Sequence, residues 1–191
     1  MGRNLTSAVC FIVICACVAG CLLEPRKPEG GGGAACFVAL PATSDFGEVF
    51  TNLDGSLECL EQSTYLDFIH PDFEFIPSAT AESSFPSVFD EPWGVSQEQQ
   101  WLNVLFADTD SLISDLRLRD IQVNVAGDQA TVEASYRLRH VPRGGGAIVY
   151  RGQGLYTLEV SGTKWVLRSW DDRDTGGGDS ALGNLRGGLL Q

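Results

Sequence analysis

The sequence predicts an α+β fold in which a curved antiparallel sheet wraps around helices from the N-terminal half. Three observations lead to this prediction. Apolar residues recur at helical spacing over 48–60, they alternate with polar residues over most of 114–173, and glycines lie inside the alternating segments. Glycines within strands mark bends or bulges, which a strongly curved sheet requires.

The length and charge of the chain limit the classes of function. Its 191 residues suit one domain with a real core, since 43% of them are hydrophobic. The formal net charge is −12, and the pI is about 4.4. So acidic a chain is a poor candidate for binding a phosphate backbone, and we expect no nucleic-acid partner.

The first twenty residues have the pattern of a secretory signal peptide. Arg3 is followed by an apolar run of eleven residues at 8–18, too short to span a membrane, and the run ends at Ala19-Gly20-Cys21. This ending resembles a bacterial lipobox, which implies cleavage of 1–20 and acylation of Cys21. The alternative is ordinary secretion with a free Cys21.

Acylation would place the protein in the cell envelope, anchored to a membrane. Several acyl chains on one residue anchor stably. Leu22 follows the cysteine where an aspartate would favour the inner membrane, so a host with two membranes would carry the protein on the outer one. Prolines and four consecutive glycines make 21–35 a flexible linker.

Two of the six cysteines remain for the domain, which we place at 36–173. Cys36 and Cys59 follow the linker, whereas the others belong to the signal segment or the anchor. An oxidising compartment allows these two to form a disulfide. They could equally be two separate small hydrophobic residues.

The first half of the domain reads as helices and one strand. Helices are predicted at 48–60 and 63–69, and a strand at 72–76. The long loop 77–94 would be a lid or an edge cover. A capping box over 96–99 opens a further helix that ends near residue 108.

The second half of the domain reads as a meander of long strands. Alternation is clear over 131–140 and 147–160, whereas its phase breaks near Arg119-Asp120, which suggests a bulge. The last strand, 164–173, has a tryptophan on each face. The alternation therefore does not show which of its two faces points into the cone. The glycine-rich tail, 174–191, is predicted to be disordered.

This order of elements resembles the nuclear transport factor 2-like superfamily, which includes SnoaL-like cyclases and ketosteroid isomerases. The resemblance rests on 65–75 (YLDFIHPDFEF), the helix with Trp101 and Phe106, and 164–172 (KWVLRSWDD). It implies a cone-shaped domain over about 45–173, of the kind that bacterial lipoproteins also carry. Members of the superfamily are isomerases, dehydratases, cyclases or non-catalytic binding modules, so the fold does not choose among these.

An enzyme would need an acid or base inside the cone. The candidates are His70, His140, Asp171 and Asp172, with Tyr136 or Tyr150 as hydrogen-bond donor, and of these we select His140 and Asp171. The chain matches no complete catalytic set of the superfamily, and His140 is more often structural at such a position. Candidate pocket residues are aromatic: Tyr65, Trp101, Tyr136, Tyr150 and Trp170. Aromatic residues at the last four of these positions are more often core residues than ligand-binding ones.

We therefore expect a non-catalytic cone that binds a small apolar ligand or an envelope protein, and a homodimer through the sheet is one form that such a module could take. The alternative is a cofactor-independent isomerase, dehydratase or cyclase acting on a small apolar substrate. A third possibility is that the cone is filled by its own aromatic residues and that the surface makes the contacts. No cofactor is implied, and two distant histidines without a cysteine cluster argue against zinc.

Overall fold

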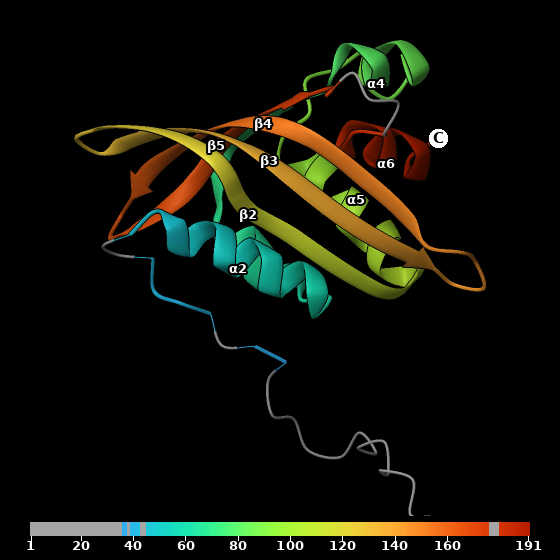
Figure 1. Cartoon of the computed structure of the whole chain (residues 1–191), viewed down its shortest axis with the longest axis horizontal. Helices are drawn as coiled ribbons and strands as arrows, with labels where there is room; N and C mark the ends of the chain where they lie inside the picture. Colours follow the sequence, from blue (N-terminus) through green and yellow to red (C-terminus); the bar gives the residue numbers. More distant parts are fainter. Residues whose placement is uncertain (1–35, 38, 43–44, 176–179) are drawn as a thin grey trace, which may run out of the picture. The chain divides into compact units, whose positions relative to one another are not determined.

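The structure is a computed structural model that describes residues 36–37, 39–42, 45–175 and 180–191; of 117–123 it describes the backbone alone (Figure 1). The predicted signal peptide, the lipidation site at Cys21 and the linker up to Ala35 lie outside the described residues. Among the residues that are described, no helix is long and apolar enough to cross a membrane.

Five strands form one sheet in the order β1-β5-β4-β3-β2. Its strands are β1 (Ile69–Ile76), β2 (Thr109–Ala126), β3 (Gln129–Pro142), β4 (Ile148–Ser161) and β5 (Lys164–Arg173). The pairs from β2 to β5 are antiparallel, whereas β1 joins β5 in parallel. The predicted α+β class and the meander of four long strands are confirmed.

The helices are α2 (Gly47–Glu58), α3 (Gln62–Asp67), α4 (Ala79–Ser84), α5 (Val95–Ala107) and α6 (Leu182–Leu189). One hydrophobic core joins the sheet to the helices, and we call the space that they enclose the cone. Phe50 of α2, for example, packs edge-on against Tyr156 of β4, with 5.1 Å between ring centroids. The helical stripe predicted over 48–60 therefore lies on the core.

A bulge in β5 resolves the ambiguity of the last strand. Leu158 pairs with Leu167 and Thr157 pairs with Ser169, so Arg168 is an extra residue on β5. An extra residue reverses the phase of a strand beyond it. Trp165 and Trp170 are thus both buried, although simple alternation places them on opposite faces. The break predicted near Arg119 also matches shifts in the β2–β3 register on either side of that residue.

The N-terminal part of the domain is tied to α2 and to the edge of the sheet. A disulfide joins Cys36 to Cys59, one of the two alternatives that the sequence left open. Ser114 and Leu116 of the edge strand β2 donate backbone N–H groups to Glu58 (3.2 Å) and Asp54 (3.0 Å) of α2. These carboxylates satisfy donors that an edge strand otherwise leaves unpaired.

The loop after β1 covers the other edge of the sheet. Phe75 of β1 donates its backbone N–H to the carbonyl oxygen of Trp93 at 2.9 Å. The loop also contains the short helix α4, which Ser78 caps by accepting from the N–H of Ala81. Of the two roles predicted for 77–94, the structure has the edge cover.

The prediction that 174–191 is disordered is wrong for the end of the chain. Residues 182–189 form α6, which lies beside α4 (Figure 1). Three glycines in eight residues give this helix a poor intrinsic propensity, so tertiary packing must stabilise it. Two of the glycines allow that packing: a Cβ at Gly183 would lie 2.8 Å from Ala81, and one at Gly187 would lie 2.4 Å from the Phe85 ring.

Candidate functional site

A buried ion pair between α5 and α6 lies inside the cone. Arg186 of α6 donates from Nε to Glu98 Oε2 at 3.0 Å and from Nη2 to Glu98 Oε1 at 2.6 Å. Both side chains have no exposed surface. The two parallel bonds form the bidentate geometry that a guanidinium and a carboxylate prefer.

Glu98 has further donors, which explain how its charge is tolerated. The Tyr65 hydroxyl donates to Oε1 and the indole N–H of Trp93 donates to Oε2, both at 2.8 Å. Each carboxylate oxygen therefore accepts two hydrogen bonds. A buried charge is stable only when it is paired and its lone pairs are satisfied. Glu98 also lies in the first turn of α5, where the helix dipole favours an anion.

Four aromatic rings surround the Arg186 guanidinium. Its central carbon lies 4.0 Å from the ring centroid of Phe75, 4.4 Å from Trp101, 4.9 Å from Trp170 and 6.0 Å from Trp93. Cations are attracted to aromatic faces at such distances. We call Glu98 and these four rings the cage. Its parts come from β1, the loop before α5, α5 itself and β5.

A second polar cluster holds the start of α6. Tyr136 donates its hydroxyl to Asp172 and accepts from the backbone N–H of Leu182 at 2.7 Å. The N–H of Gly183 donates to the other oxygen of Asp172 at 2.8 Å. Burial raises the pKa of Asp172 to about 6, although these hydrogen bonds and Arg186 act in the opposite direction. Burial and the nearby Asp172 charge raise the pKa of Tyr136.

The predicted base Asp171 is not inside the cone. Its side chain is 29% exposed and bonds Arg173 at 2.9 Å. The bulge at Arg168 turns its neighbour Asp172 inward instead, which alternation along β5 did not reveal. The structure therefore places Asp171 in a surface ion pair with Arg173, away from the interior position that we expected for a base.

His140, the other predicted base, lies at a separate pocket, which we call the mouth pocket. This pocket has a volume of about 210 Å³ between the ends of β3 and β4 and the helix α6. Its lining residues are Asp108, His140, Pro142, Ile148, Tyr150, Asn184, Leu185, Gly188 and Leu189. Of the predicted pocket residues, only Tyr150 lines it.

Hydrogen bonds assign the tautomer of His140. The Thr109 hydroxyl donates its one hydrogen to the carbonyl oxygen of Leu105 at 2.5 Å, so it accepts from His140 Nε2 at 3.0 Å. Nδ1 then carries a lone pair in the neutral ring, and it has no partner within the described part of the chain. Burial lowers the pKa of His140, against a smaller opposing effect of Asp108. The imidazole is therefore neutral at pH 7.

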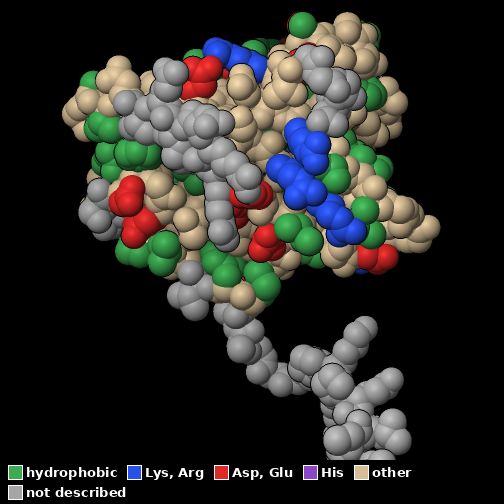
Figure 2. Space-filling model, in the orientation of Figure 1, with side chains coloured by type: hydrophobic (Ala, Val, Ile, Leu, Met, Phe, Trp, Pro, Cys, Tyr) green, Lys and Arg blue, Asp and Glu red, His purple; other side chains and the backbone are tan. Residues whose placement is uncertain are grey.

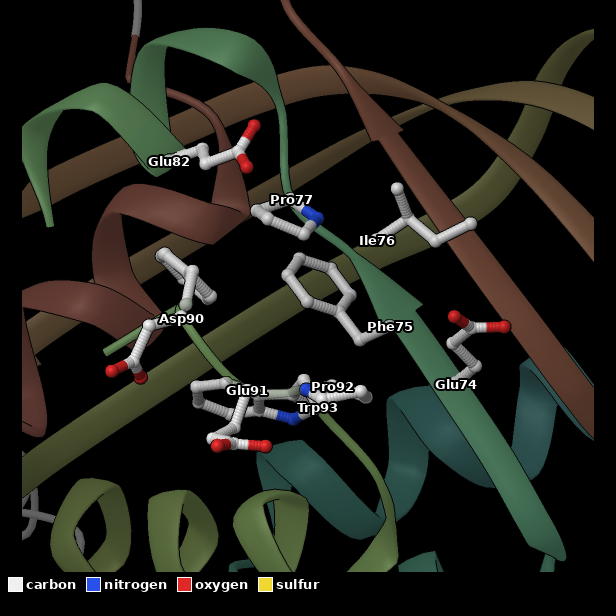
Figure 3. A pocket seen from close by; sticks show the side chains of 10 residues that line it. Glu74, Phe75, Ile76, Pro77, Glu82, Asp90, Glu91, Pro92 and Trp93 are labelled. Carbon is white, nitrogen blue, oxygen red and sulfur yellow. The ribbon is translucent and has the colours of Figure 1, made fainter. Parts of the chain in front are cut away.

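Another pocket, besides the mouth pocket, lies outside the cone, and we call it the outer groove. Figure 3 shows carboxylates of Glu74, Glu82 and Glu91 around Phe75 and Trp93. The groove has a volume of about 300 Å³. It shares these two rings with the cage, on their outer side.

The structure thus divides the five aromatic candidates. Tyr65, Trp101, Tyr136 and Trp170 surround the two buried clusters, where they are core residues, whereas Tyr150 lines the mouth pocket. Sequence reasoning missed Arg186 and Glu98. For Arg186, the one indication in the sequence was an arginine between apolar residues of the tail (LGNLRGGLL). Glu98 was assigned to a capping box, but α5 begins at Val95, with Gln97 bonding the N–H of Gly94.

Metal ligation has no support from side-chain clusters. In the described ranges, no three His, Cys, Asp or Glu side chains are grouped so that they could hold a metal ion.

Comparisons with known proteins identify the fold. No family model and no curated protein matches this chain. Solved structures do match it. A superfamily protein of nuclear transport factor 2 type from Salmonella enterica is 15% identical with a TM-score of 0.55, over 72% of this chain and 95% of that one.

Two further structures carry names of enzymes. A candidate scytalone dehydratase from Novosphingobium aromaticivorans is 12% identical with a TM-score of 0.57, over 68% of this chain and 80% of that one. A candidate dehydratase of the nuclear transport factor 2-like family from Streptomyces avermitilis is 14% identical with a TM-score of 0.52, over 68% of this chain and 93% of that one. At such identities the likeness concerns the fold, and the described domain has the nuclear transport factor 2-like fold.

Proposed function

We propose that the chain is a membrane-anchored lipoprotein whose cone domain binds a small ligand or a partner protein without catalysing a reaction. One observation carries the non-catalytic part: the protein fills its own cone. Arg186 lies where an interior ligand would contact Glu98, and it has no exposed surface. While α6 is docked, Arg186 occupies the position beside Glu98 that such a ligand would need.

The buried acids are also engaged in other bonds. A general base must offer a lone pair within hydrogen-bond reach of the substrate. Glu98 accepts four hydrogen bonds, and Asp172 accepts from Tyr136 and Gly183. Both carboxylates thus serve to hold α6 and the surrounding elements together.

The mouth pocket is the site that we propose for a small ligand. At about 210 Å³ it is smaller than the pockets that take drug-sized molecules. Leu185, Leu189 and Ile148 give it an apolar lining, and His140 and Asn184 supply polar groups. This mixture favours a small apolar molecule with one or two hydrogen-bonding groups.

Native mass spectrometry of the full mature protein, purified from cells in detergent, tests the ligand proposal. We expect a co-purifying small molecule that is lost on denaturation. Asn184→Trp would fill the mouth pocket and should abolish the ligand-bound mass. Asn103→Trp, at an exposed position of α5, should leave the ligand-bound mass in place. An apo mass for the unmodified protein would count against a small ligand and leave a partner protein.

The membrane anchor has a separate test. We expect intact mass to show a mature chain that begins at an acylated Cys21, and Cys21→Ser to release the protein from the membrane fraction. An unmodified cysteine on a secreted chain would contradict this part of the proposal and would leave the ligand proposal unaffected.

The outer face of the sheet is the surface that we propose for a protein partner, including a second copy. Figure 2 shows side chains of both signs on one face of the molecule, with a short row of Lys and Arg. Across β3 and β4, Arg137 pairs in register with Arg151, and Ile113 of β2, which pairs with Arg139, is 52% exposed. Sedimentation velocity over a range of concentrations would reveal a dimer, which Ile113→Asp should weaken.

One observation favours an enzyme as the second candidate function. Neutral His140 lines the mouth pocket together with Tyr150, and its Nδ1 has no partner among the described residues. A neutral imidazole can remove a proton, as cofactor-independent isomerases, dehydratases and cyclases require. If a ligand co-purifies, its conversion on incubation, lost in His140→Gln while binding persists, would establish catalysis.

A further inference from the structure

The cage and the arginine that it holds belong to separate parts of the chain. Glu98 and the rings of Phe75, Trp93, Trp101 and Trp170 come from elements before α6, which also fix the carboxylate through Tyr65. The cation comes from α6 alone. The cage is therefore a host that the rest of the domain forms, and Arg186 on α6 is the guest that it holds.

The geometry of the host is that of a guanidinium site. A planar guanidinium can bond both oxygens of Glu98 while aromatic faces stack on it, whereas an ammonium ion offers no such plane. Arg186 meets both conditions, with the two Glu98 bonds at 2.6 and 3.0 Å and ring centroids from 4.0 Å. The cage therefore discriminates by shape as well as by charge.

The guest is held incompletely. Nη1 of Arg186 is buried and has no hydrogen-bond partner within the described residues. A buried donor without a partner weakens an interaction. A ligand that brought its own acceptor beside its guanidinium would satisfy this donor, which α6 does not.

The guest helix is also weakly formed by itself. Gly183, Gly187 and Gly188 lower its helix propensity, and its eight residues are too few to be stable without docking. Its fixed points are the buried Leu182 and Leu185 and the polar bonds to Asp172, Tyr136 and Glu98. A short helix that depends on its tertiary contacts in this way can open below the free energy of global unfolding.

The outer groove adds a charge argument. Its rings Phe75 and Trp93 are two walls of the cage, and Glu74, Glu82 and Glu91 surround them on the outside. Carboxylates of one sign around a hollow raise the local concentration of cations. A cationic ligand would therefore gather next to the cage before α6 opens.

We propose that the cage is a guanidinium-binding site, which Arg186 fills in cis and which an external guanidinium compound, such as a peptide arginine, fills when α6 leaves. This proposal concerns the interior and does not depend on a ligand in the mouth pocket.

Chemical rescue of the full chain tests the site. Arg186→Ala should lower the melting temperature, and millimolar methylguanidinium chloride should restore at least half of the loss in a saturable manner. The wild-type melting temperature should not rise. Methylammonium chloride at equal ionic strength should restore much less, and Glu98→Gln in the same chain should abolish the rescue. If Arg186→Ala does not fold, Arg186→Met, which keeps more of the volume, replaces it.

Hydrogen exchange of the wild-type protein tests whether α6 leaves. The amides of Leu182 and Gly183 should exchange faster than those of Tyr156 and Trp170, and arginine methyl ester should accelerate the two α6 amides alone, to a plateau. The proposal is overturned if a folded Arg186 variant shows no saturable effect of methylguanidinium. It is equally overturned if the α6 amides exchange no faster than the sheet, because the cage would then be closed to outside ligands.

Discussion

The interior of the cone and its mouth use polar residues in opposite ways. In the interior, Glu98 and Arg186 are fully buried and bonded to each other, with Tyr65 and Trp93 completing the cluster. At the mouth, His140 makes one hydrogen bond to Thr109 and keeps a lone pair beside a pocket of about 210 Å³. The Glu98 carboxylate, which accepts four hydrogen bonds, fixes the interior, whereas His140 at the mouth has a ring nitrogen with no partner among the described residues.

This difference teaches which residues to assign to stability and which to function. A buried charge network stabilises only if it stays complete, because removing one member strands the others. A side chain that lines a pocket outside this network can be changed at lower cost, because its removal strands no buried charge. Four measurements follow from this contrast.

The largest effect is expected at the buried ion pair. Glu98→Ala strands the Arg186 charge inside the cone and should lower the free energy of unfolding by about 3–5 kcal/mol in urea titrations. The matched control Glu91→Ala, at an exposed position of the outer groove, should change it by less than about 0.5 kcal/mol. Similar effects of the two substitutions would mean that the pair does not hold the interior together.

The next effect, taken for each titrating group by itself, is a dependence of stability on pH. Burial raises the pKa of Asp172 and of Asp54 from 3.8 to about 6. Between these values the folded state binds more protons than the unfolded chain, so the free energy of unfolding falls as the pH rises from about 4 to about 6. Each group contributes up to about 3 kcal/mol to this fall.

Urea titrations at pH 4 and pH 7 would measure the fall. The lowered pKa of His140 acts in the opposite sense, because the unfolded chain then binds the extra proton just below pH 6.5. Asp54→Asn keeps the acceptor for Leu116 and should remove about half of the fall. A free energy of unfolding that rises from pH 4 to pH 7 would contradict the assignment of buried acids.

A smaller effect separates an interior tyrosine from one at the mouth. Tyr136→Phe deprives Asp172 of a donor and the N–H of Leu182 of an acceptor, so we expect a loss of about 2 kcal/mol in stability. Tyr150→Phe, at the mouth pocket, should cost less than about 0.5 kcal/mol. If Tyr150→Phe were the more destabilising change, the mouth would be as tightly bonded as the interior.

The smallest effect is expected at the acid that sequence reasoning selected. Asp171 bonds Arg173 at the surface, where an ion pair contributes little. Asp171→Asn should therefore change the melting temperature by less than about 2 °C. A larger fall would show that Asp171 has a structural role beyond this pair.

The sequence determined the parts of this protein that depend on local pattern. Alternation over 131–140 and 147–160 predicts β3 and β4, because successive side chains of a strand point to opposite faces. Helical spacing over 48–60 predicts α2, and the pair Cys36 and Cys59 allowed the disulfide that the structure has. None of these requires knowledge of a distant partner.

Only the tertiary structure decided what fills the cone. The bulge at Arg168 depends on the register with β4, so local alternation could not show that Asp172 points inward and Asp171 outward. A segment with three glycines becomes the helix α6 because it docks on distant residues, among them Glu98, which Arg186 contacts from 88 positions later in the chain. Such a contact has no periodic signal in sequence, because its free energy comes from two side chains that meet only after folding.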